Sequence, residues 1–110
     1  MKKEDKEKSN HNHAQLVVPK EQVDLVMGLY NDGSINEAID AIKALNEDYP
    51  NVPLLFNLLG ACYNNLGQFA AAAQFFESAF KIKPDYAEAY MNHGTALREA
   101  GKFDLAVKSF

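Results

Sequence analysis

A period of 34 residues runs through this chain and constrains its fold more than any other feature: Gly33, Gly67 and Gly101 define it, since 67 − 33 and 101 − 67 both equal 34. The same step links the alanines Ala38, Ala72 and Ala106, the large apolar residues Ile42, Phe76 and Phe110, the apolar residues Ile35, Phe69 and Phe103, and the prolines Pro50 and Pro84. A fixed period of this size is typical of a solenoid, in which each unit buries its apolar face by stacking on its neighbours. The sequence therefore predicts one array of similar units.

Each unit is predicted to be a pair of helices, and the stretch 53–86 shows this most clearly. Gly67 can end a first helix in a left-handed conformation, and Pro84 stops a second helix because proline cannot continue the helical hydrogen bonds. The predicted fold class is therefore all-α, an antiparallel helix-pair solenoid. Apolar or small residues recur at the i, i+3, i+4, i+7 spacing of an amphipathic helix, first at Phe56, Leu59, Gly60 and Tyr63 and again at Phe69, Ala72, Ala73 and Phe76.

At these positions the chain resembles the tetratricopeptide repeat family. The third unit departs from the family pattern at His93 and Leu97, and the first unit departs from it at Gln22 and Val26. The resemblance implies a superhelix of about two and two-thirds repeats, which we interpret as the N-terminal fragment of a longer protein. The repeats are expected at about 19–52, 53–86 and a truncated 87–110, and the middle one carries the family's aromatic, Leu-Gly, Tyr, Ala, Phe, Ala and Pro as Phe56, Leu59, Gly60, Tyr63, Ala72, Phe76, Ala79 and Pro84.

The N-terminal part of the chain divides into a tail and the start of the repeats. Residues 1–15 are polar and charged, so they should form a disordered tail, and the repeat domain should span 16–110. The apolar triplet 16–18 is expected to fold over the open end of the first unit. Pro19 suits the first position of a helix that runs to about Asn31.

Two further signals predict the start of a second helix within a unit. Ser34 and Glu37 have the spacing of a capping box, in which each side chain bonds a backbone N–H of the other residue. In the third unit, a turn at Gly101 should precede a second helix that begins near Phe103.

Composition argues against nucleic-acid and membrane partners. The formal net charge is -4 at pH 7 and no stripe of Lys or Arg is visible, whereas binding to phosphates needs a basic face. The chain has no signal-peptide h-region and no apolar run long enough to cross a bilayer, so we place the protein in the cytoplasm.

No catalytic, metal or cofactor site is predicted. The sequence has no Gly-rich phosphate loop, no H-E-x-x-H and no paired cysteines. His11 and His13 lack a third ligand of the right type nearby. Cys62 is expected to be a small core residue. His93 occupies the repeat position of Leu59, so it should pack between helices with its ring nitrogens hydrogen-bonded.

By resemblance, the first helices of successive repeats line a concave groove that binds a peptide or partner segment. Asn side chains in it offer donors and an acceptor to the backbone of an extended peptide, which favours sequence-tolerant binding. Replacing Asn57 and Asn64 by Ala should therefore weaken binding while leaving the fold intact. The residues expected to line the groove are Val23, Met27 and Tyr30 in the first unit, Asn57, Ala61 and Asn64 in the second, and Met91, Asn92, Thr95 and Arg98 in the third.

The preferred function is a non-catalytic protein-protein interaction module. The alternative is the N-terminal substrate-presenting arm of a larger bacterial glycosyl- or sulfo-transferase, whose catalytic domain would follow; Asn92 fits the Asn ladder of such relatives and Leu58 does not. The carboxylate clamp of chaperone-binding relatives is rejected, because Val23, Met27 and Glu88 stand where it needs Lys, Asn and Lys. Self-association through the uncapped third unit is a further possibility.

Overall fold

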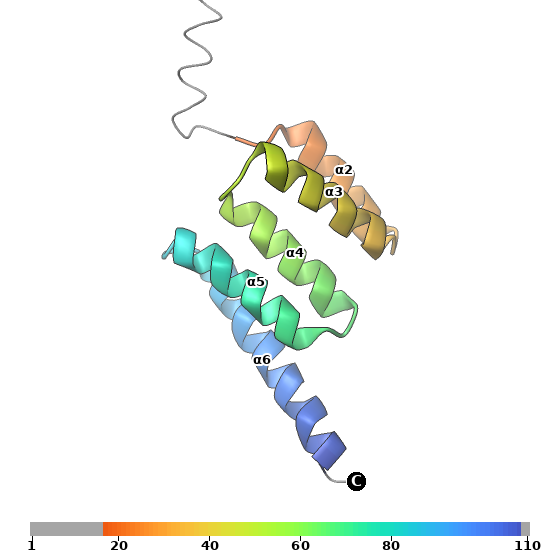
Figure 1. Ribbon diagram of the computed structural model, residues 1–110, viewed down its shortest axis with the longest axis vertical. Coiled ribbons are helices and arrows are strands. Elements are labelled where there is room, and N and C mark those ends of the chain that lie inside the picture. Colours follow the sequence, from red (N-terminus) through yellow and green to blue (C-terminus); the bar gives the residue numbers. More distant parts are fainter. Residues whose placement is uncertain (1–16, 109–110) are drawn as a thin grey trace, which may run out of the picture.

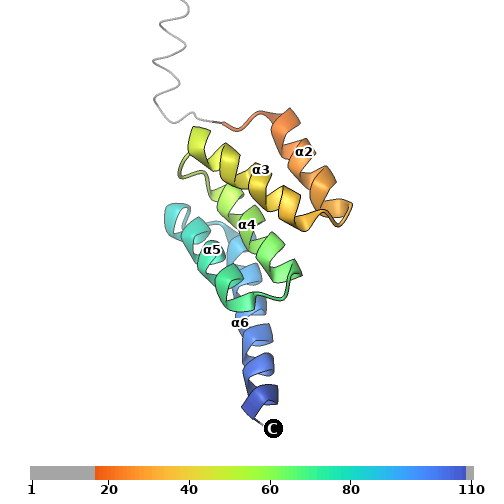
Figure 2. The same ribbon diagram turned by 45° about the vertical axis from the view of Figure 1, so that its right-hand side comes forward.

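The computed structural model describes residues 17–108, with side chains described for residues 17–102. Successive helices pack on one another in chain order, and α4 also touches α6. In Figure 1, α2 lies behind α3, and the first part of α6 lies behind α5. Helix α4 lies between these two pairs, and Figure 2 shows the same stack turned. The all-α, antiparallel helix-pair solenoid is thereby confirmed. The described helices are α2 (Lys20–Asn31), α3 (Ile35–Asp48), α4 (Pro53–Asn65), α5 (Phe69–Ile82) and α6 (Ala87–Lys108).

The turns inside the first two pairs are built in the same way. Gly33 and Gly67 both have positive φ, 86° and 79°, which an L side chain rarely adopts. Ser34 N–H donates to the Leu29 carbonyl, and Gln68 N–H donates to the Tyr63 carbonyl, both at 2.9 Å. These bonds skip back five residues and make each turn a Schellman motif, which satisfies carbonyls at the helix end.

The predicted turn at Gly101 is not formed, because Ala87–Lys108 is one continuous helix. Glycine permits a left-handed turn but does not impose one. In the first two units the second helix packs on the first helix of the next unit, α3 on α4 and α5 on α6. Among the described residues no helix follows the third unit, so a second helix there would lack this contact. Figures 1 and 2 both show the C-terminal part of α6 extending past the N-terminal end of α5.

The predicted capping box at the start of α3 is also wrong. Ser34 does precede the helix, but its side chain makes no capping hydrogen bond. The physical reason is that the Schellman turn already uses the Ser34 N–H, which is the donor that the Glu37 side chain would have accepted. The helix before it begins at Lys20, one residue later than predicted, with Pro19 just outside it.

The core runs along the stack between neighbouring helices. Phe76, Ile42 and Leu55 are its largest fully buried side chains. Of the apolar triplet expected to cover the open end, Val18 is buried and Val17 is 75% exposed. The remaining member of that triplet and the predicted tail 1–15 lie outside the described residues.

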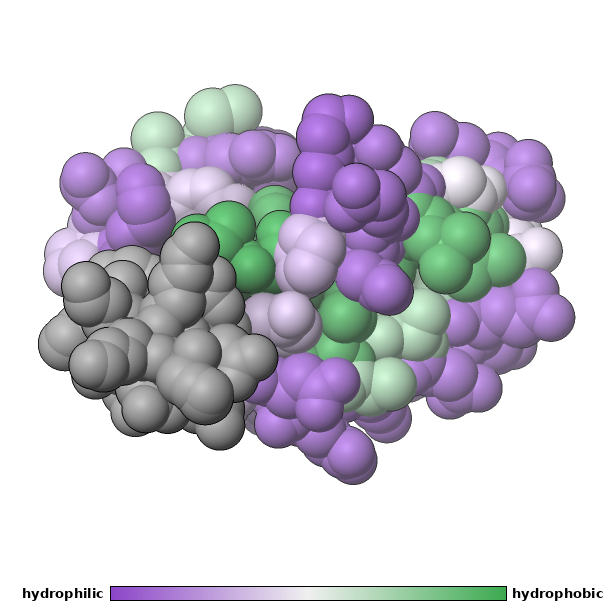
Figure 3. All heavy atoms as spheres, turned by 90° about the horizontal axis from the view of Figure 1, so that it is seen from above, coloured by the Kyte–Doolittle hydropathy of each residue, from purple (hydrophilic) through white to green (hydrophobic). Residues whose placement is uncertain are grey.

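Seen from the end of the stack at which α2 and α3 lie, the surface is mostly hydrophilic. Figure 3 shows polar residues separating several smaller hydrophobic areas on this face. Within the described part of the chain, no helix is both long enough and apolar enough to cross a membrane.

Candidate functional site

A hollow of about 140 Å³ is lined by residues of the first helix of each of the three units. Met27 and Tyr30 come to it from α2, Asn57 from α4, and Glu88 and Asn92 from α6. The lining is completed by Leu58 and Ala61 from α4. One helix of each unit therefore contributes to a single concavity, which we call the groove hollow.

An amide pair crosses the groove hollow from α4 to α6. The Asn92 Nδ2 group donates a hydrogen bond of 3.2 Å to Asn57 Oδ1. Asn57 is 4% exposed, and it is the buried polar residue of the described core. Its amide is thus used inside the protein, so the expectation that Asn57→Ala leaves the fold intact is revised: a buried amide whose partner is lost costs about 1–3 kcal/mol.

Tyr86, in the turn before α6, belongs to the same network. Its pKa is raised above its ordinary value, chiefly by burial of the hydroxyl and then by the negative charge of Glu88. A hydrogen bond from the Asn57 side chain acts in the opposite direction on that pKa. Asn57 therefore accepts from Asn92 with its oxygen, and its side chain lies near enough to the Tyr86 hydroxyl to act on that pKa.

Half of the sequence-predicted groove residues surround the hollow, and the others do not line it. Asn64 is half-buried at the end of α4, and its Oδ1 accepts no hydrogen bond from the described residues. Met91 is 71% exposed. Thr95 and Arg98 are also exposed, where Arg98 donates to Thr95 Oγ1 at 3.5 Å. Val23 instead packs against the buried core cluster that spans the first unit and α4.

Two lining residues were not among the predicted groove residues. Leu58 lies three residues before Ala61 and Glu88 lies four residues before Asn92, so each shares a helix face with a predicted residue. The helical spacing was therefore a signal that could have found both.

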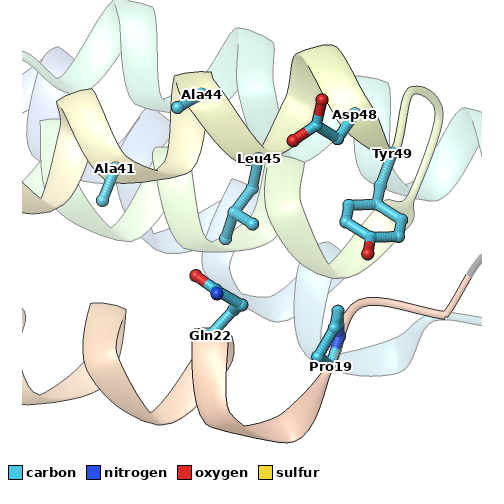
Figure 4. Close-up of a pocket in the computed structure, with 7 residues that line it drawn as sticks. All are labelled: Pro19, Gln22, Ala41, Ala44, Leu45, Asp48 and Tyr49. Carbon is cyan, nitrogen blue, oxygen red and sulfur yellow. The ribbon is translucent and has the colours of Figure 1, made fainter.

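A second, larger hollow of about 350 Å³ lies between the start of α2 and the end of α3. Figure 4 shows Pro19 and Gln22 on one side of it, and Leu45, Asp48 and Tyr49 on the other. Ala41 and Ala44 complete its wall. All of its lining comes from the first helix pair and the Pro19 and Tyr49 that flank those helices, so it does not depend on the stacking of units.

The remaining chemistry-bearing residues of the described chain have structural surroundings. Cys62 is 1% exposed, and burial raises the pKa of its thiol from 9.0 to about 11, which disfavours the reactive thiolate. His93 packs edge-on against Phe80, with ring centroids 5.1 Å apart, as expected for a residue between helices. The expected hydrogen bonds to its ring nitrogens are not among those found for the described residues.

No group of three His, Cys, Asp or Glu side chains between residues 17 and 102 is arranged to hold a metal ion. His11 and His13, the pair weighed as half of a metal site, lie outside the described residues.

Comparisons with known proteins agree with the resemblance seen in the sequence. The family model described as "Tetratricopeptide repeat" matches residues 55–86. Among curated proteins, Protein FlbA of Caulobacter vibrioides is 32% identical over 72 residues, which are 66% of this chain and 12% of FlbA. The chain therefore corresponds to a small part of that relative's length.

The fold is shared with the solved structure described as "MamA RS-1 ArsTM double mutant". The TM-score is 0.70 at 24% sequence identity, and the match covers 79% of this chain and 49% of that one. A likeness at this level of identity shows the fold alone.

Proposed function

We propose that this chain, which is a repeat protein of the tetratricopeptide type, is a non-catalytic interaction module that binds a segment of a partner protein in the groove hollow. The family match and the solenoid fold support a protein-interaction scaffold. The family match is to a repeat unit rather than to a catalytic domain. Neither it nor the two relatives described above supports the alternative of a transferase arm.

The observation that carries the proposal is the convergence of α2, α4 and α6 on one concavity. A pocket that encloses a small-molecule ligand usually measures about 300–1,000 Å³. The groove hollow, at about 140 Å³, is too small for that and suits one or two side chains of a longer segment. Its apolar wall, Met27, Leu58 and Ala61, would take an apolar side chain, while the rest of the segment lies along the three helices.

A selection of displayed random linear peptides on the 110-residue chain tests the proposal. Peptides that bind should lose affinity when Ala61→Arg places a long charged side chain in the groove hollow. The matched control is Ala70→Arg, because Ala70 is an exposed alanine on α5 that does not line the groove hollow. We expect Ala61→Arg to weaken binding by about tenfold or more, which corresponds to about 1.4 kcal/mol, and Ala70→Arg to leave it unchanged. Equal binding by the two variants would contradict the proposal.

The cytoplasmic location expected from the sequence stays a prediction. It is compatible with a peptide-binding module, and fractionation of cells that produce the full protein would check it.

A further inference from the structure

The amide pair in the groove hollow has a direction. Asn92 turns its Nδ2 toward Asn57, which accepts with Oδ1. The oxygen of the same amide is an acceptor that this bond does not use. That oxygen accepts no hydrogen bond from the described residues. Asn92, which lines the hollow, therefore keeps an acceptor that no described residue uses.

Glu88 adds a negative charge one helical turn before Asn92. It is the charged residue among those that line the groove hollow, and its side chain is exposed there. The described ion pairs join Lys20 to Asp24, Lys81 to Glu77, Lys83 to Asp85 and Lys102 to Glu99, so none of them neutralises Glu88. A carboxylate is acceptor-only when ionised. The α6 wall thus offers a ligand two acceptors, the Glu88 carboxylate and Asn92 Oδ1, beside the second N–H of Asn92.

We propose that the groove hollow selects partner segments in which a lysine or arginine neighbours an apolar side chain. The apolar side chain packs against Met27, Leu58 and Ala61, and the cation bonds the Glu88 carboxylate and Asn92 Oδ1. Charge-assisted hydrogen bonds of this kind are stronger than neutral ones, and the net charge of -4 favours the approach of a basic segment. This inference rests on the proposed function and adds to it the chemistry of the partner.

The test is to repeat the peptide selection with the wild-type chain, Glu88→Lys and Glu47→Lys. Glu47 is an exposed acid on α3 outside the groove hollow, so its replacement makes the same change in net charge elsewhere. Peptides selected by the wild type should be enriched in Lys and Arg. Glu88→Lys should lose that enrichment and favour Asp and Glu, whereas Glu47→Lys should keep it.

Affinity measurements on the strongest selected basic peptide complete the test. Glu88→Gln, which keeps the shape of the side chain, should weaken binding by about fivefold, near the upper end for an exposed ion pair, and the loss should shrink at high salt. A peptide in which the basic residue is replaced by Gln should bind wild type and Glu88→Gln equally. Melting curves followed by circular dichroism show that each variant is folded.

The outcomes separate this inference from the proposed function. If no peptide is selected, or if the selected peptides ignore Ala61→Arg, the groove hollow is not a peptide site and both proposals fail. If peptides are selected and are lost on Ala61→Arg, but carry no basic enrichment or keep it in Glu88→Lys, only the inference about charge is overturned.

Discussion

At the scale of single residues, Gly60 on α4 is fixed by the ring that packs on it. A Cβ at this position would lie 2.7 Å from Phe76 Cζ and closer still to other atoms of that ring. Phe76 is 1% exposed, so the ring is enclosed by protein and cannot swing out into solvent without opening the core. The small residue of the repeat pattern is therefore needed for close approach of α4 and α5.

We predict that Gly60→Ala lowers the free energy of unfolding by about 1–3 kcal/mol, the usual cost of overpacking a core. The matched control is Gly94→Ala in α6, where the added Cβ would meet no atom within 4 Å beyond its chain neighbours and the backbone of its own helix. This control should gain about 0.5–1 kcal/mol, because alanine favours a helix over glycine. Urea unfolding followed by circular dichroism measures both. A stabilised Gly60→Ala variant would refute the close packing of α4 on Phe76.

A second residue-scale prediction concerns Cys62. Its thiol pKa rises from 9.0 to about 11 in the folded chain. At about pH 8 the folded thiolate fraction is then about a hundredfold below that of the unfolded chain, so reaction with Ellman's reagent should be slow and accelerate on unfolding in urea. Burial of the thiol should slow the reaction further.

The same shift predicts a pH dependence of stability. The pKa of the thiol is higher in the folded chain than in the unfolded chain. The stabilisation that comes from keeping the thiol neutral is therefore fully present below pH 9.0 and is lost as the pH rises to about 11. Cys62→Ala should show a smaller fall in unfolding free energy over that range. A thiol that reacts equally fast in folded and unfolded chains would contradict the buried position.

At the scale of the elements, the three glycines that share a repeat position fall into two classes. Gly33 and Gly67 end helices with positive φ, whereas Gly101 lies within the continuous α6. Gly33→Ala and Gly67→Ala should each cost about 1–2 kcal/mol, since L residues are strained in the left-handed region. Gly101→Ala should instead gain about 0.5–1 kcal/mol. If thermal or urea unfolding shows all three to be destabilising, α6 is broken at Gly101.

The helix pairs were predictable because their signals are local. Apolar spacing defined the helices, and the turn glycines placed their ends, so the helix predicted to end at about Asn31 does end there. The capping box was not predictable, because whether the Ser34 N–H is free depends on the turn before it. The unbroken helix at Gly101 was not predictable either, since glycine adopts helical and left-handed conformations about equally readily and its presence does not choose between them.

At the scale of the whole molecule, the groove hollow depends on how the units curve around one another. Periodicity assigns Met27, Ala61 and Asn92 to the correct helix faces, but the reach of each side chain into the concavity is set by the angles between helices. The burial of Asn57 illustrates this, because the sequence indicated a polar residue of the groove and the stacking of α6 on α4 enclosed it.

Self-association through the third unit stays a prediction, and α6 offers a surface for it. Tyr90, Met91 and Leu97 are 46%, 71% and 51% exposed on this helix. If copies pair there, the weight-average sedimentation coefficient should rise with concentration, and Leu97→Glu should suppress the rise because it places a charge in an apolar contact. A strict monomer at high concentration would reject the pairing.

The most direct test of the central claim, that the first helices of three units form one binding groove, is a titration followed by nuclear magnetic resonance. The isotope-labelled full chain is titrated with the strongest selected peptide, and shifts of backbone and side-chain amides are mapped on the structure. We expect the largest shifts at Met27, Tyr30, Ala61 and Asn92, and none at Glu47, an exposed residue of α3 that does not line the groove hollow. Shifts confined to α3 and α5, or to one helix pair alone, would contradict it.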